Sequence, residues 1–166
     1  PAMCMFGVKP FPDDQDVDLK LKQVLELKCR IEFVKDIKAG DSVTYFGKFV
    51  AEKDMRIGTM HIGFFDAIPR ELANKIRIRV GDKFQQGVGS IALNHSLLDL
   101  TDTDAVIGDT VTVIGREGEN TLIDIATASN WMVYSVMNHL NSNLPRVFID
   151  GGRPVALLDP INQYSQ

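Results

Sequence analysis

Alternation of apolar and charged residues is the strongest pattern in this chain. From Leu19 to Phe33 the odd positions are mostly apolar, and most even positions carry Lys, Glu or Arg. A repeat of two residues places the two sets of side chains on opposite faces of an extended strand. The pattern therefore predicts a long, half-buried strand over residues 19–33.

Shorter apolar segments follow, and turn residues such as Gly-Asp separate them. The further segments expected to form strands are Val43–Phe49, Ile57–Phe65, Ile76–Val80, Val88–Leu100 and Val111–Ile114. Short strands joined by turns are typical of a β-barrel or a β-sandwich. The pattern predicts a mainly β domain.

Two segments favour a helix. The first is Thr121–Asn130, where apolar residues share a helical face and Thr121 can cap the start. The second is Tyr134–Leu140. Beyond it, Leu144–Ile149 and Val155–Leu158 are expected to form the two strands of a terminal hairpin.

The start of the chain differs in composition. Met3–Gly7 is a short apolar segment that we interpret as a strand, and Pro10–Asp14 looks like a connector. We therefore treat residues 1–15 apart from residues 16–166, which are expected to form the main β domain.

Composition and charge exclude several classes. The chain has 166 residues, 45% apolar and 24% charged, as expected of one globular domain. A net charge of −4 without a Lys/Arg cluster argues against nucleic acid or an anionic membrane as partner. No apolar run approaches the length that spans a bilayer.

Cysteine and histidine add little chemistry. Cys4 and Cys29 are expected to be reduced thiols in a cytoplasmic protein. The three histidines, His61, His95 and His139, lack the spacing of local metal motifs, so no metal is expected.

The segment Ala39–Arg70 reads AGDSVTYFGKFVAEKDMRIGTMHIGFFDAIPR. It resembles the carboxy-terminal domain of alanine racemases, whose motifs read roughly G-D-S-V-x-Y-G and then I-G-Y-x-D-G-x-P-R. The residues in step with those motifs are Tyr45, Gly63, Asp66, Pro69 and Arg70. The resemblance implies a mainly β fold, an alanine racemase C-terminal-domain-like β-barrel with one or two short helices.

The resemblance also implies half of an active site. Racemisation with pyridoxal phosphate needs two acid–base groups on opposite faces of Cα. Tyr45 matches the family's tyrosine base, which enters the active site of the partner subunit in a homodimer. The lysine that carries pyridoxal phosphate belongs to an amino-terminal barrel domain with no counterpart here. Met3–Gly7 resembles the last strand of that barrel, so residues 1–15 are expected to be a remnant of this strand plus a connector. The resemblance thus makes this chain a fragment, inactive by itself, of an enzyme that interconverts L- and D-alanine.

Two further residues match the family by position. Tyr134 lies eleven residues before Pro145, and its hydroxyl would bind the cofactor phosphate. Arg70 would line the substrate access corridor. From the residues alone, Tyr45 and Tyr134 would be packing residues, Arg70 a solvated loop charge, and Asp66 a turn residue.

The chain departs from the family motif at several positions. Phe64 stands where the family has a gate tyrosine, and Ala67 where it usually has glycine. Ser90, Leu93 and Asn94 replace an arginine, a methionine and an aspartate. The backbone N–H of Leu93 can still meet a substrate carboxylate, as the methionine N–H does in the family.

Two alternatives remain open. These departures are also consistent with a non-catalytic or altered-specificity homologue that acts in dimerisation or regulation. The second alternative is a small β-barrel that binds oligonucleotides. It is suggested by four basic residues on one face of the first predicted strand: Lys20, Lys22, Lys28 and Arg30. Few aromatic residues accompany that face, although single-strand binders need them for stacking.

Overall fold

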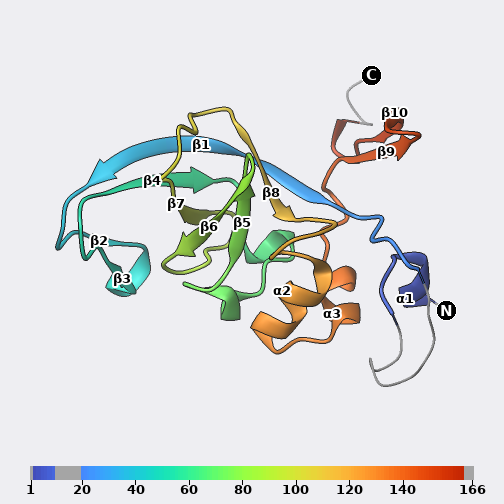
Figure 1. Cartoon of the computed structure of the whole chain (residues 1–166), viewed down its shortest axis with the longest axis horizontal. Helices are drawn as coiled ribbons and strands as arrows, with labels where there is room; N and C mark the ends of the chain where they lie inside the picture. Colours follow the sequence, from blue (N-terminus) through green and yellow to red (C-terminus); the bar gives the residue numbers. More distant parts are fainter. Residues whose placement is uncertain (1, 10–19, 163–166) are drawn as a thin grey trace.

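A computed structural model describes residues 2–9 and 20–162 of the chain (Figure 1). Six strands of this part form a closed antiparallel barrel in the order β1-β4-β7-β6-β5-β8. Their bounds are β1 Leu27–Ile37, β4 Met55–Met60, β5 Arg77–Val80, β6 Lys83–Val88, β7 Ser96–Asp99 and β8 Thr110–Ile114. The predicted mainly β barrel is confirmed.

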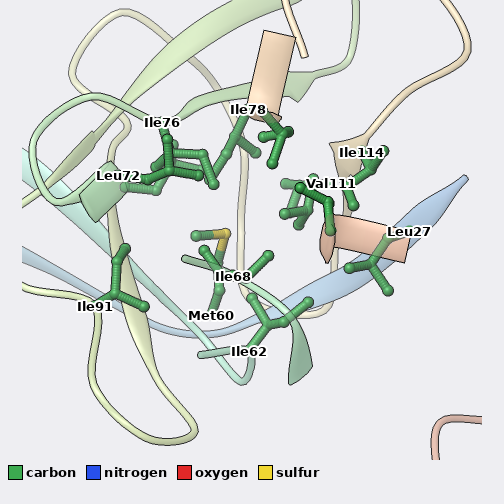
Figure 2. Close-up of a cluster of buried hydrophobic side chains, with 14 of the residues drawn as sticks. Leu27, Met60, Ile62, Ile68, Leu72, Ile76, Ile78, Ile91, Val111 and Ile114 are labelled. Atoms are coloured by element: carbon green, nitrogen blue, oxygen red, sulfur yellow. The ribbon is translucent and has the colours of Figure 1, made fainter. Parts of the chain in front are cut away.

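The barrel encloses a core of aliphatic side chains (Figure 2). Inward-facing strand residues such as Met60, Ile78 and Val111 are fully buried. Ile68 and Leu72, which come from the segment between β4 and β5, join the same cluster. Burying apolar surface in this way is the main stabilising term of the domain.

Strand β1 closes the barrel because it pairs with two neighbours. Its first residues pair with β8, and its later residues, from Ile31 onward, pair with β4. The pairing with β4 shifts by one residue between Ile31 and Phe33, so Glu32 is the extra residue of a β-bulge. The bulge reverses which face each side chain takes, and Phe33 is 53% exposed.

The strand predicted over residues 19–33 is therefore only partly right. Residues 20–26 form no strand, residue 19 lies outside the described residues, and the observed strand continues to Ile37. The basic row proposed for an oligonucleotide surface consequently does not lie on one strand. Lys28 Nζ also pairs with Glu26 Oε2 at 3.2 Å, which offsets part of that charge.

Both predicted helices are confirmed. Helix α2 spans Leu122–Ser129 and helix α3 spans Val133–Asn138. Thr121 caps α2, because its Oγ1 accepts a hydrogen bond from the Asp124 backbone N–H (3.3 Å). The Thr121 N–H in turn donates to Asp124 Oδ2 (2.8 Å), which completes a capping box. No helix among residues 2–9 and 20–162 combines the length and apolar character needed to cross a membrane.

Three strand predictions need correction, one near the chain start and two in the loops. Met3–Gly7 is not a strand: Ala2–Met5 forms the short helix α1, because the Phe6 N–H donates to the Met3 carbonyl (3.0 Å). The expected connector Pro10–Asp14 lies outside the described residues. Residues 61–65 and 89–95, expected to be in strands, are turns and loops instead.

The terminal hairpin is confirmed, but it is separate from the barrel. Strands β9 (Arg146–Asp150) and β10 (Arg153–Leu158) form a two-stranded sheet of their own. Five of its apolar residues are at least half exposed: Val147, Phe148, Ile149, Val155 and Leu157. An isolated two-stranded hairpin is only marginally stable in water and usually needs a hydrophobic face packed against another element. The exposed apolar residues of this hairpin have no such cover within the described residues.

Candidate active-site residues

Tyr45 lies at the tip of a tight turn. Strands β2 (Ser42–Val43) and β3 (Phe49–Val50) flank the 3₁₀ turn η1, Tyr45–Gly47. The expected strand around Tyr45 is thus interrupted, because Thr44 and Phe46 have positive φ angles of 67° and 62°. The turn projects the tyrosine from the domain, and 69% of its surface is exposed.

The Tyr45 turn is fastened to the loop after β6. The Ser90 backbone N–H donates a hydrogen bond to Thr44 Oγ1 (3.1 Å). A Cβ atom at Gly89 would lie only 2.4 Å from the Thr44 methyl group, so glycine permits this close approach. Asn74 Oδ1 accepts the Gly89 N–H. These contacts hold the exposed phenol on a defined support.

The second motif forms a loop that is joined to the segment containing Leu93. The Phe64 N–H donates to the Ala92 carbonyl and the Phe65 N–H to the Leu93 carbonyl, both at 3.0 Å. A Cβ at Gly63 would lie 2.2 Å from the Ala92 carbonyl oxygen, so only glycine fits there. No group among the described residues accepts the Leu93 N–H. That donor is available to a ligand.

Asp66 has a structural role in the same loop. The residue is 8% exposed, and its Oδ2 accepts the Gly63 backbone N–H (3.1 Å). The contact closes the 3₁₀ turn η2, Phe64–Asp66. The interpretation of Asp66 as a turn residue is confirmed.

Phe64 and Arg70 line one shallow pocket of about 230 Å³ together with Trp131 and His139. Arg70, which starts the 3₁₀ turn η3 (Arg70–Leu72), places its Cζ 5.4 Å from the centroid of the Phe64 ring. A cation over an aromatic face is held in place by the ring quadrupole. The structure therefore brings these two candidate substrate-binding residues together.

Tyr134 belongs to helix α3, which Trp131 and His139 of that pocket flank in the sequence. It is 48% exposed, and no group among the described residues hydrogen-bonds its hydroxyl. Trp131 instead makes an edge contact with His139, with ring centroids 4.8 Å apart. In Figure 1 the β2–β3 turn lies at the left end of the molecule, whereas α3 lies to the right of the barrel. One copy of this chain thus does not bring Tyr45 and Tyr134 into one site.

Sequence reasoning missed Asn74. It adopts a left-handed φ of 58°, its N–H donates to the Gly89 carbonyl (3.2 Å), and its side chain accepts from the same residue. Asn tolerates that conformation better than most residues, which is the one local signal that could have indicated it.

Comparison with known proteins agrees with these motifs. Residues 24–148 match the family model described as alanine racemase, C-terminal domain. The chain belongs to the alanine racemase family. It is 32% identical to the alanine racemase of a Nostoc species over 149 residues, which are 88% of this chain and 38% of that protein. The alanine racemase of Laribacter hongkongensis is 33% identical over 147 residues, which are 88% of this chain and 41% of that relative.

Solved alanine racemases share the fold. The enzyme of Clostridium difficile in complex with cycloserine superposes with a TM-score of 0.86 at 25% identity, over 93% of this chain and 41% of that one. The Bartonella henselae enzyme with covalently bound pyridoxal phosphate gives 0.77 at 26% identity, over 86% and 39%. This chain therefore spans about two fifths of the relatives it matches and corresponds to their carboxy-terminal part.

Proposed function

We propose that this chain is the carboxy-terminal domain of an enzyme that interconverts L- and D-alanine with pyridoxal phosphate. Tyr45 supplies one of the two acid–base groups, across a homodimer interface. The observation that carries this proposal is the geometry of Tyr45: an exposed phenol on a turn that is fastened to the loop at Gly89 and Ser90. A side chain placed in this way can enter a site formed by another chain.

The separation of Tyr45 from Tyr134 supports the dimer. If both residues serve one kind of active site, each site takes them from two copies of the domain, because the barrel lies between the β2–β3 turn and α3 (Figure 1). The exposed apolar hairpin β9–β10 supports a further contact, which we assign to the remaining part of the full-length enzyme.

The residues present fit part of a pyridoxal phosphate site. When bound, this cofactor withdraws electrons from Cα and so acidifies its proton. The Tyr134 hydroxyl, which has no partner among the described residues, would donate to the phosphate. A lysine that holds the cofactor is normally desolvated so that its amine is neutral, whereas all ten lysines of this chain are exposed. We assign that lysine to the rest of the enzyme.

The other candidates would bind and orient the amino acid. The Leu93 N–H can donate to the substrate carboxylate, and Arg70, fixed over Phe64, can attract that carboxylate towards the site. Tyr45 would hold or accept the proton on one face of Cα. An ordinary phenol has a pKa of about 10, so a cation near the Tyr45 oxygen in the assembled site is needed to lower it.

The experiment is Tyr45→Phe in the full-length enzyme. We expect racemisation to fall by roughly 10²–10⁴-fold, the usual contribution of a general acid–base group, while the cofactor stays bound. Racemisation is followed by polarimetry and cofactor content by absorbance. Tyr134→Phe is the matched control, since it removes the same hydroxyl atom but should weaken cofactor affinity. Near-normal rates in both directions for Tyr45→Phe would make Tyr45 a packing residue.

The alternative is a non-catalytic or altered-specificity homologue. It is favoured by Phe64, which provides no gate hydroxyl, and by Ser90 and Asn94 in place of an arginine and an aspartate. The same experiment separates the two functions. A full-length wild-type enzyme without turnover on any small amino acid would establish the alternative, and turnover on a larger amino acid would indicate altered specificity.

A further inference from the structure

Two histidines that are far apart in the sequence face each other across neighbouring strands. In the antiparallel pair β4–β7, Met60 is the register partner of Ser96, and both side chains are buried. One step further along the same register, His61 lies opposite His95. Because successive side chains alternate between faces, both rings point outward, and both residues are exposed.

A carboxylate reaches the same place because of the bulge in β1. Ile31 pairs with Met60 and is buried, and the extra residue Glu32 therefore lies beside the two histidines on the outer face. Without the bulge, strict alternation would still turn Glu32 outward, but Phe33 would turn inward. The bulge instead leaves Glu32 and Phe33 exposed in succession.

The three side chains converge in space. The His61 and His95 rings are stacked, with centroids 4.9 Å apart and planes inclined by 22°. His61 Nδ1 lies 3.0 Å from Glu32 Oε1, and His95 Nε2 lies 3.9 Å from Glu32 Oε2. One donor atom from each residue lies within 4.8 Å of the other two. No other described group hydrogen-bonds either imidazole ring.

We propose that Glu32, His61 and His95 form a surface site for a divalent transition metal ion such as Zn²⁺. Two imidazole nitrogens and a carboxylate oxygen are a common ligand set for Zn²⁺, and three protein ligands leave one position open to water. This proposal differs from the expectation of no metal, which rested on spacing along the sequence.

The observed distances are close to what the ion requires. Bonds of about 2.0–2.2 Å to a tetrahedral Zn²⁺ place neighbouring donor atoms about 3.3 Å apart. The His61–Glu32 distance of 3.0 Å already fits. The His95 donor atom is further away, and the stacked rings must turn about their side-chain bonds to aim at one ion. Both histidines are exposed, which allows that movement.

A plain surface ion pair is the competing explanation, and metal titration separates the two. The 166-residue chain, without an affinity tag and stripped with EDTA, is titrated with Zn²⁺ by calorimetry and with Co²⁺ by visible absorption. We expect one site per chain. His61→Ala, His95→Ala and Glu32→Gln should each weaken binding roughly tenfold or more, because even loss of an outer-sphere partner commonly costs tenfold.

His139→Ala is the matched control. His139 is also exposed, but its Nδ1 lies 2.7 Å from the Ser135 carbonyl oxygen on α3, away from the other two histidines. Its replacement should leave metal affinity unchanged. Ring resonances of His61 and His95, but not of His139, should shift on addition of Zn²⁺. Glu32→Gln keeps the side-chain volume and therefore guards against a folding artefact.

Three results would overturn the proposal. They are absence of a one-to-one complex, equal affinity of the His61→Ala and His139→Ala variants, and a thiolate charge-transfer band with Co²⁺. The last would assign the ion to a cysteine thiolate and not to the two histidines.

Discussion

Ala67 shows what a single departure from the family motif costs. It ends the 3₁₀ turn η2 with a left-handed φ of 92° and is buried. An L-residue in that region is strained by about 1–2 kcal/mol, whereas glycine is not. The structure thus gives a physical reason for the glycine that the family usually has at this position.

We therefore predict that Ala67→Gly leaves the free energy of unfolding nearly unchanged. Relief of the strain offsets the lost buried methyl group, about 0.8 kcal/mol, and the added freedom of the unfolded chain, about 0.5–1 kcal/mol. Ala128→Gly, in helix α2, has no strain to relieve and should cost about 1 kcal/mol. Urea denaturation measures both variants. Equal losses would show that Ala67 is unstrained.

At the scale of the elements, Gln23 joins three parts of the fold. Its Nε2 donates to the carbonyl oxygens of Leu25 (2.8 Å) and Gly115 (2.6 Å), and its Oε1 accepts the Leu122 N–H (3.0 Å). One side chain thus connects the segment before β1, the residue after β8 and the start of helix α2. Gln23 is a polar exception among the mostly apolar odd positions of residues 19–33.

Gln23→Ala should lower the free energy of unfolding by about 2 kcal/mol, because three partly buried hydrogen bonds at roughly 0.5–1.5 kcal/mol each are lost. Gln85→Ala is the matched control, since Gln85 is half-buried on β6 and no described side-chain hydrogen bond involves it. Chemical denaturation followed by far-UV circular dichroism compares the two. If both variants lost the same stability, the bridge at Gln23 would contribute little.

At the scale of the whole molecule, the chain has a complete core but an incomplete site. The closed barrel buries its own aliphatic side chains (Figure 2). The candidate residues Tyr45 and Tyr134, by contrast, are exposed and belong to elements on opposite sides of the barrel. Stability and catalysis are therefore expected to separate when this chain is studied alone.

We predict that the purified 166-residue chain unfolds cooperatively but neither holds pyridoxal phosphate nor racemises alanine. Its lysines are all exposed, so none is desolvated as a cofactor-bearing lysine is. Differential scanning calorimetry tests folding, and absorbance after gel filtration tests cofactor retention; the full-length enzyme is the positive control. Borohydride-stable attachment of the cofactor to a specific lysine of this chain would contradict the prediction.

The sequence by itself determined features that depend on neighbouring residues. Helix α2 begins after Thr121 because a threonine followed by Asp124 can satisfy the first backbone N–H groups. Strands β5 and β8 match their alternating or apolar segments closely. The resemblance of the motifs at Tyr45 and Asp66 also identified the family, and hence the barrel, without coordinates.

Only the tertiary structure decided features that depend on strand register and barrel closure. The bulge at Glu32 follows from pairing with β4, and alternation along β1 could not reveal where its phase reverses. The same register brings His61 opposite His95. The support of the Tyr45 turn by Ser90 likewise joins residues distant in sequence. Sequence patterns record local geometry, whereas these contacts exist because antiparallel pairing places remote residues side by side.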